Sequence, residues 1–398
     1  MQEKNYEWGE GVFTLLSWFK KDKVKNARVL VAGAGALGNE VVKDLALFGI
    51  GHIYVVDFDR IEYSNLTRSV LFREEDAHKH SFKAEIVAKR AMEINPQIKV
   101  TPIVGDLYSD VGFGIYKSVD VVIGCLDSRI ARYRLNRLCM RANKTWVDGS
   151  IENLTGAVKV FTPGISCYEC SLSREEFNYI MLRTGCADVY QSQNSAGRVA
   201  TTPISASIIG AMQVQEAMKI IHLDPQEKTP FKTLQGRMLR YEGMTNSMNI
   251  YKFASWKNNC VAHEQWKNIV EAKNFSSQMT VKEALLELKK LLGVKKVEIN
   301  LQNNKFISKI VSEMPEKEYP VLMSESKLEE YIKHHAELRK MSYRTLFHKF
   351  YVEDIDADFP HQQLTLQQIG IPPFDVIRVS TEKGLFYVEL SGDSNLYL

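Results

Sequence analysis

The chain has 398 residues, of which 45% are hydrophobic and 25% charged, and its formal net charge is +3. This length allows about two or three domains, and the composition is that of a globular protein with a sizeable core. The near-zero charge, without a concentrated basic run, argues against a nucleic-acid-binding or membrane-surface protein. No apolar stretch approaches the roughly 18 residues that span a bilayer, and the start of the chain has no apolar signal core. Because the six scattered cysteines are not a disulfide framework, we expect a cytoplasmic protein with reduced thiols or bound metal.

The first predicted element is a helix within residues 6 to 24 that packs against the core or against a second subunit. Its apolar residues are Trp8, Phe13, Leu15, Leu16, Trp18 and Phe19. A large, mostly aromatic set of this kind indicates packing and not chemistry.

The next stretch predicts the start of a nucleotide-binding α/β unit. A buried strand at residues 28 to 32 leads into a glycine turn at 33 to 38, and a helix at 39 to 48 precedes a second strand at 53 to 56. This order is that of the dinucleotide-binding fingerprint, which taken alone most often indicates NAD or FAD.

Each residue of this fingerprint has its own physical task. Gly33 and Gly35 allow a tight turn and a close approach to a phosphate, and Gly38 lets the helix and strand pack closely. The helix N-terminus offers free N–H groups to an anion. Asp57, about 20 residues past the turn, lies where a ribose hydroxyl is expected.

Polar residues after the second strand argue for a triphosphate and against a redox cofactor. Asn65, Arg68 and Lys83 bring an amide and two cations to one nucleotide. That set suits a triphosphate whose phosphorus is attacked better than a dinucleotide that lends a hydride. The alternative is that both cations are surface charges, because Lys83 begins an amphipathic helix over residues 82 to 94.

After a predicted strand at residues 98 to 104, a further buried strand at residues 121 to 123 is followed by Asp127. An aspartate at the carboxyl end of a buried parallel strand faces the crevice where open α/β sheets bind ligands. We expect it to hold Mg²⁺ on the triphosphate, since this cation takes one or two carboxylates. Alternatively, it caps the helix of residues 128 to 142.

Together these motifs resemble the adenylation domain shared by ubiquitin-activating enzymes and the ThiF and MoeB sulfur-carrier adenylyltransferases. The resemblance rests on GAGALG, DFDRIEYSNLTR, FKAE and GCLDS in that order, over roughly residues 25 to 265. It implies a Rossmann-like α/β domain with a mostly parallel sheet, which uses ATP and Mg²⁺ to adenylate the C-terminal glycine of a ubiquitin-like protein. It also implies the following ATP-binding residues: Gly33, Gly35, Ala36, Gly38, Asp57, Asp59, Ser64, Asn65, Arg68, Lys83, Asp127 and Ser128.

The N-terminal region departs from the pattern of this family. Members usually carry an arginine there that reaches the ATP of the neighbouring subunit, and this sequence has none before Arg28. Lys20 or Lys21 could approach, but an ammonium does not replace a forked guanidinium. A homodimer is therefore implied by the resemblance alone. Arg129 and Arg132 resemble the activating-enzyme branch and are otherwise expected to be solvated charges.

Two short motifs predict a structural zinc site. Cys167 and Cys170 form a CxxC pair, and Cys260 and His263 form a second knuckle. Three thiolates and one imidazole fit a closed tetrahedral zinc site. The family usually has a second CxxC here, so His263 is a departure, although a chemically acceptable one. The alternatives are a redox pair and two buried thiols.

Cys186 stands apart from both knuckles. The polar stretch from residue 191 to 198 predicts a mobile crossover loop over about residues 171 to 203. A cysteine at this place resembles the acceptor thiol of the family, which takes the carrier as a thioester or, in the sulfur branch, as an acyl disulfide. Arg183 and Arg198 could lower its pKa. The alternative is an unreactive thiol, because MoeB-type enzymes can work without this cysteine.

A domain boundary is predicted near residues 274 to 277, so that residues 1–268 form the adenylation domain and residues 275–398 a smaller α+β domain. At its end, this domain is predicted to have a short helix, a turn and strands in succession. This order resembles the β-grasp, ubiquitin-fold domain of activating enzymes, which recruits the conjugating enzyme. MoeB and ThiF proteins usually end near the second zinc knuckle, so these further residues favour conjugation. The alternative is an unrelated appendage for oligomerisation or carrier docking.

The sequence therefore predicts an activating enzyme that adenylates a ubiquitin-like protein, loads it on Cys186 and passes it to a conjugating enzyme. The alternative within the fold is a sulfur-carrier adenylyltransferase without a thioester step. A nucleotide-dependent dehydrogenase lacks support from any catalytic His or Tyr arrangement. A non-catalytic partner subunit is disfavoured because Asn65, Arg68, Lys83 and Asp127 are all present.

Overall fold

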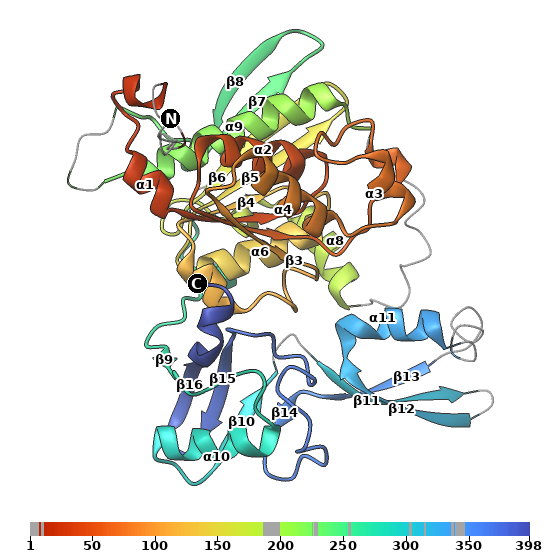
Figure 1. Ribbon diagram of the computed structural model, residues 1–398. Coiled ribbons are helices and arrows are strands. Elements are labelled where there is room, and N and C mark those ends of the chain that lie inside the picture. The colour runs from red at the N-terminus through yellow and green to blue at the C-terminus, as the bar shows by residue number, and fades with distance from the viewer. Residues whose placement is uncertain are drawn as a thin grey trace, which may run out of the picture. The chain divides into compact units, whose positions relative to one another are not determined.

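The computed structural model describes residue 8 and residues 12–185, 200–224, 226, 230–253, 256–301, 305–313, 316–335, 338 and 347–398. The chain divides into two compact units, coloured in chain order in Figure 1. The first comprises Met1–Leu107 and Tyr116–Gln265, and the second comprises Tyr108–Ile115 and Trp266–Leu398. Among the described helices, none has both the length and the apolar character that crossing a lipid bilayer requires.

The first unit is built on an eight-stranded sheet in the order β3-β2-β1-β4-β5-β6-β7-β8. The pairings from β3 to β5 are parallel, and those from β5 to β8 are antiparallel. The predicted Rossmann-like sheet is therefore confirmed. The strands are β1 Arg28–Ala32, β2 His52–Val56, β3 Lys99–Ile103, β4 Val121–Gly124, β5 Trp146–Glu152, β6 Thr155–Phe161, β7 Arg237–Glu242 and β8 Ser247–Lys252.

Helices cover the sheet (Figure 1). They are α1 Lys21–Asn26, α2 Ala36–Phe48, α3 Glu74–His78, α4 Lys83–Ile94, α6 Arg129–Arg141, α7 Tyr168–Ser171, α8 Arg174–Gly185 and α9 Pro203–His222. Apolar residues of α2, α4 and α9 share one core with β1, β2 and β4. The helix α2 begins at Ala36, earlier than the sequence predicted and within the glycine turn, and ends at Phe48. The next residue, Gly49, caps it with a φ of 81°, the left-handed conformation that glycine adopts without strain.

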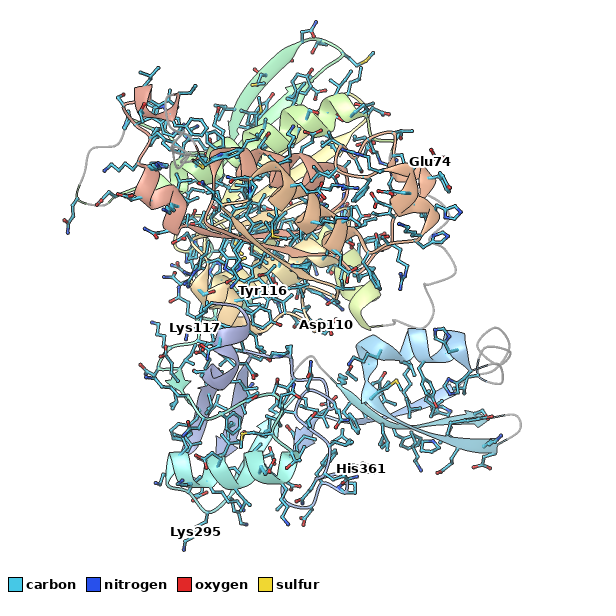
Figure 2. The ribbon with its side chains drawn as sticks, in the orientation of Figure 1. Glu74, Asp110, Tyr116, Lys117, Lys295 and His361 are labelled. Atoms are coloured by element: carbon cyan, nitrogen blue, oxygen red, sulfur yellow. The ribbon has the colours of Figure 1, made fainter. Side chains whose placement is uncertain are left out.

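The predicted packing helix within residues 6 to 24 is not continuous in the described part of the chain. A short 3-10 helix, Phe13–Leu15, and α1 take its place. The rings of Phe13 and Phe19 both pack against Phe48 of α2, at centroid distances of 5.5 and 6.3 Å. Residues six apart do not share a face of an α-helix, so this packing requires the chain to turn. Glu74, at the start of α3, is an exposed residue of this unit (Figure 2).

The second unit contains the predicted α+β fold. Its helix α10, Val281–Leu292, starts with a Thr280–Glu283 capping box and buries one face. A five-stranded sheet has the order β14-β10-β15-β16-β9, with a parallel pairing only between β16 and β9. Its strands are β9 Val270–Glu271, β10 Val297–Asn300, β14 Asp354–Ile355, β15 Val376–Thr381 and β16 Gly384–Glu389. Lys295, in the turn between α10 and β10, is exposed (Figure 2).

A second, smaller sheet is inserted between β10 and β14. Its order is β12-β11-β13, and it has a small core of its own with α11, Glu325–His334. Its strands are β11 Phe306–Glu313, β12 Glu316–Ser324 and β13 Phe347–Val352.

A buried carboxyl group, that of Asp375, holds the segment 108–115 within the second unit. The Phe113 N–H donates to Asp375 Oδ1 at 2.8 Å, and the Gly114 N–H donates to the Phe374 carbonyl at 2.9 Å. A Cβ atom at Gly112 would lie 2.1 Å from the Pro373 carbonyl oxygen, so glycine is required there. Burial raises the pKa of Asp375 to about 6, against the opposing effect of the N–H groups of Phe113 and Val376.

This raised pKa predicts a pH-dependent stability. Between about pH 4 and pH 6 the folded carboxyl holds a proton that the unfolded chain releases, so wild type gains stability relative to Asp375→Asn as the pH falls through this window. Between these pH values, the difference in unfolding free energy between wild type and the variant should change by on the order of 2 kcal/mol. Urea unfolding followed by tryptophan fluorescence at about pH 4.5 and 7.5 measures it. The control is Asp358→Asn at an exposed carboxylate, and the same pH dependence in both variants would contradict the assignment.

Candidate nucleotide and metal sites

The candidate nucleotide site lies where the carboxyl ends of β1, β2 and β4 meet. β1 pairs with β2 on one side and with β4 on the other, so the strand order reverses there. The Gly33 N–H donates to the Val56 carbonyl at the end of β2, and the Cys125 N–H donates to the Ala32 carbonyl at the end of β1, both at 2.8 Å. This switch point is where open α/β sheets form a ligand crevice.

The glycine turn is shaped by close backbone approaches. Gly33 has a φ of +100°, and a Cβ atom on it would lie 2.5 Å from the Cys125 carbonyl oxygen. A Cβ atom on Gly38 would lie 2.0 Å from the Gly33 carbonyl oxygen. At Gly35 an added Cβ would meet nothing within 4 Å. Packing therefore requires glycine at residues 33 and 38, whereas residue 35 borders open space at the start of α2.

Asp57 holds this turn from the side of β2. One carboxylate oxygen accepts the Ala34 N–H at 2.7 Å, and the other accepts the Asp59 N–H at 2.7 Å. Burial raises the pKa of Asp57, while the bond from Ala34 and the charge of Lys83 oppose that shift. The carboxylate thus orders the turn.

Lys83 is held in place at the start of α4. Its Nζ lies 2.7 Å from Asp59 Oδ2, and its backbone N–H donates to the Asp59 carbonyl at 2.9 Å. Only 11% of the side chain is exposed. An ordinary surface lysine is neither buried to this degree nor fixed at both ends, so the surface-charge alternative does not describe this residue.

The loop between β2 and α3 carries Asn65 and Arg68. Asn65 Oδ1 accepts the Glu62 N–H at 3.0 Å and closes a short 3-10 helix, Tyr63–Asn65. Arg68 Nη1 donates to the Ser64 carbonyl at 2.7 Å. Both polar side chains therefore bond to their own loop and fix its shape.

Asp127 is exposed at the end of β4, next to the N-terminus of α6. The capping residue of α6 is Ser128, whose Oγ accepts the Ala131 N–H at 3.4 Å. The alternative that Asp127 caps this helix is therefore wrong. Its carboxylate remains suited to a hard cation such as Mg²⁺ on a triphosphate.

The alternative that Arg132 is a solvated charge is wrong. Its Nε donates to Asp148 Oδ1 at 2.8 Å, and its Nη2 donates to the carbonyls of Leu126 and Gly149, the latter at 3.1 Å. The side chains of Arg132 and Asp148 are 12% and 2% exposed. An unpaired charge could not be buried here, and the pair joins α6 to β5 and to the segment that follows β4.

Cys167, Cys170, Cys260 and His263 converge on one point. Their ligand atoms all lie within 4.8 Å of one another, and His263 Nε2 is 3.3 Å from Cys170 Sγ. Cys167 precedes α7, and Cys260 precedes the 3-10 helix Val261–His263. This donor set and spacing fit a tetrahedral zinc ion, in which the three thiols would bind as thiolates.

Neighbouring groups support this zinc cluster. Asn136 Nδ2 donates to Cys167 Sγ at 3.3 Å, and Asn136 Oδ1 accepts the Tyr168 N–H at 3.0 Å. The Trp256 ring stacks on His263 at a centroid distance of 3.3 Å. Partners of this kind orient the ligands of a metal site.

Cys186 and residues 191 to 198, including Arg198, lie outside the described residues, as does the side chain of Arg183. Within the predicted crossover stretch, residues 174–185 form the helix α8. Sequence reasoning also missed Asn39, a fully buried side chain that bonds the glycine turn. In the sequence, the only indication of this role was that a polar residue occupies one of the apolar positions of α2.

A comparison with known families identifies the fold. The ThiF family matches residues 13–262. The chain belongs to the ThiF family. Over 151 residues it is 36% identical to SUMO-activating enzyme subunit 2 of Dictyostelium discoideum, which covers 37% of this chain and 22% of that protein.

Two further comparisons extend over more of this ThiF-family chain. It is 31% identical over 274 residues to the probable molybdopterin-synthase adenylyltransferase of Pyropia yezoensis, which covers 68% of this chain and 67% of that protein. The crystal structure of E. coli MccB is similar with a TM-score of 0.48 and 24% identity, over 61% of this chain and 67% of MccB.

The zinc site gives a direct prediction. We expect about one zinc ion per chain in the purified protein, because a closed site of this type binds zinc tightly. Cys260→Ser should abolish stoichiometric zinc and lower the melting temperature, as measured by metal analysis and calorimetry. Cys139→Ser changes a thiol buried in α6 outside the cluster and should keep the zinc. Zinc loss in both variants, or in neither, would contradict the assignment.

Proposed function

We propose that this ThiF-family protein uses ATP to adenylate the C-terminal glycine of a ubiquitin-like protein. The observation that carries the proposal is the carboxyl edge of the sheet, where the open space beside Gly35, the fixed ammonium of Lys83 and the carboxylate of Asp127 occur together. The family membership supports it. A triphosphate suits this set, because its charge needs cations and its metal needs a carboxylate.

Adenylation requires little covalent chemistry from the protein itself. A carboxylate oxygen of the carrier's C-terminal glycine attacks the α-phosphorus of ATP, and the bond from that phosphorus to the bridging oxygen breaks. Pyrophosphate leaves with the electron pair, and no proton has to move because the nucleophile is already a carboxylate. Catalysis then consists of positioning and of stabilising the developing charge.

The residues of the site divide these tasks. Lys83 and Arg68 would stabilise the negative charge on the phosphate oxygens, and the glycine turn with the N-terminus of α2 would hold the phosphates. Asp57 and Asn65 would fix the nucleoside and the loop. Mg²⁺, with Asp127 as its protein ligand, supplies further charge neutralisation when it is bound with ATP.

We further propose that Cys186 accepts the carrier. Its thiolate would attack the carbonyl carbon of the adenylate, forming a thioester and releasing AMP, with the thiol proton passing to solvent. The second unit would then recruit a conjugating enzyme. The likeness to a protein named as a SUMO-activating subunit and the α+β fold beyond residue 262, where the family match ends, support this assignment. We propose a homodimer in the cytoplasm.

A sulfur-carrier adenylyltransferase is the second candidate. It is favoured by the Pyropia yezoensis protein, whose likeness spans 68% of this chain. In that case the adenylate would pass to a separate sulfur donor, and Cys186 would not form a thioester.

Adenylation is tested by ATP–pyrophosphate exchange with a panel of ubiquitin-like proteins that end in Gly-Gly. Lys83→Ala and Arg68→Ala should each reduce the exchange rate about 100 to 1,000-fold, because each removes a charge that stabilises the transition state. Lys89→Ala, an exposed lysine on the same helix α4, should leave the rate unchanged. Exchange that survives in Lys83→Ala would refute the assigned role, and absence of exchange with every carrier would refute the adenylation.

The thioester step is tested with Mg-ATP and an active carrier on non-reducing gels. We expect a covalent band that thiols remove and that is absent in Cys186→Ala, because only a nucleophilic thiol forms such a bond. Cys186→Ala should retain wild-type pyrophosphate exchange. Exchange without any band in wild type would assign the protein to the sulfur-carrier class.

A further inference from the structure

Asn39 is a fully buried polar residue on α2, with no exposed surface. Its Nδ2 donates to the Ala34 carbonyl at 2.9 Å and to the Gly35 carbonyl at 3.0 Å. Its Oδ1 accepts the Leu71 N–H at 2.9 Å. One side chain therefore joins the glycine turn to the loop that follows Arg68.

The two segments that it joins have separate tasks at the site. Ala34 is held on both sides, since Asp57 accepts its N–H and Asn39 donates to its carbonyl. The loop passes from Arg68 to Leu71 through successive turns, in which the Arg68 N–H donates to the Asn65 carbonyl and the Phe72 N–H donates to the Ser69 carbonyl. Leu71 therefore lies three residues beyond Arg68 in a loop that is bonded within itself on either side of it.

A buried amide of this kind is costly unless all its bonds are made. Both ends of the Asn39 side chain are used, and each end bonds to a different segment of the site. An apolar residue would fill the same space in the core between α2 and the loop, so packing alone does not require an amide. The hydrogen bonds of the Asn39 amide are what an apolar residue of the same size could not provide.

We propose that Asn39 is a positioning residue that sets the geometry of the Arg68 loop relative to the glycine turn. It touches neither ATP nor carrier and acts through the segments that do. This inference rests on the proposed adenylation for its kinetic consequences, but the linkage of the two segments is a property of the free protein. Loss of the amide should disturb the turn and the loop together.

The chain offers a matched control in Asn95. This asparagine is also fully buried, donates to the Ala46 carbonyl at 2.9 Å and accepts the Gln97 N–H at 3.0 Å, near the other end of α2. Asn95→Ala removes a comparable set of bonds without contact to the turn or the loop. Any effect shared by Asn95→Ala and Asn39→Ala is therefore loss of stability and not of positioning.

Amide hydrogen exchange measured by mass spectrometry tests the linkage without any ligand. In Asn39→Ala, exchange should rise at least about tenfold in peptides over residues 33 to 38 and over residues 64 to 71, because each segment loses a bond to the core. Asn95→Ala should leave both segments at the wild-type rate. Unchanged exchange in either segment of Asn39→Ala, or an equal rise in Asn95→Ala, would overturn the proposal.

A second experiment tests the consequence for ATP and separates the two ends of the amide. Asn39→Asp in its ionised form keeps an acceptor for Leu71 but has no hydrogen to donate to Ala34 and Gly35, so it should weaken ATP binding about tenfold by calorimetry. In pyrophosphate exchange, Asn39→Ala should cost less in an Arg68→Ala background than in wild type, because the two residues act through one loop. Strictly additive losses would overturn the positioning role. If pyrophosphate exchange fails with every carrier, only the proposed adenylation is refuted. ATP binding and amide hydrogen exchange still decide the role of Asn39.

Discussion

The candidate nucleotide site depends on the close approach of the ends of two strands, β1 and β4. The turn after β1 comes so near to the end of β4 that a Cβ atom at Gly33 would lie 2.5 Å from the Cys125 carbonyl oxygen. This contact places the glycine turn beside the segment that carries Asp127. The parallel pairing of β1 with β2 brings Asp57 to the same edge, where its carboxylate accepts the Ala34 N–H. Packing of the backbone thus brings the glycine turn, Asp57 and the segment that carries Asp127 to one edge of the sheet.

Two cations at this edge, Lys83 and Arg132, are held by carboxylate partners. Lys83 pairs with Asp59, and the buried guanidinium of Arg132 pairs with Asp148. Fixed dipoles and charges need no reorganisation when a reaction develops charge, which is why an arrangement of this kind suits phosphoryl chemistry. The Lys83–Asp59 pair also means that ATP would have to compete with, or join, an existing ion pair.

The cluster of three cysteines and one histidine is a separate feature of this unit. It joins two segments that are far apart in the chain, the one before α7 and the one around residue 260, at a point braced by Asn136 of α6. A metal with four protein ligands has no open position and is therefore structural. It would fix the region just before and after the stretch that contains Cys186, and so limit where an acceptor thiol can lie.

The sequence by itself determined the class of fold, the motifs of the parallel strands in their chain order, and which three cysteines and one histidine could together hold a metal ion. These follow from local patterns: apolar runs that form buried strands, glycines at fixed spacing, and cysteine and histidine pairs. It could not show that Arg132 is buried on Asp148, that Ser128 caps α6, or that residues 12 to 24 do not form one helix. Those outcomes, like the bridge made by Asn39, depend on which side chains distant segments bring together, and only tertiary packing decides that.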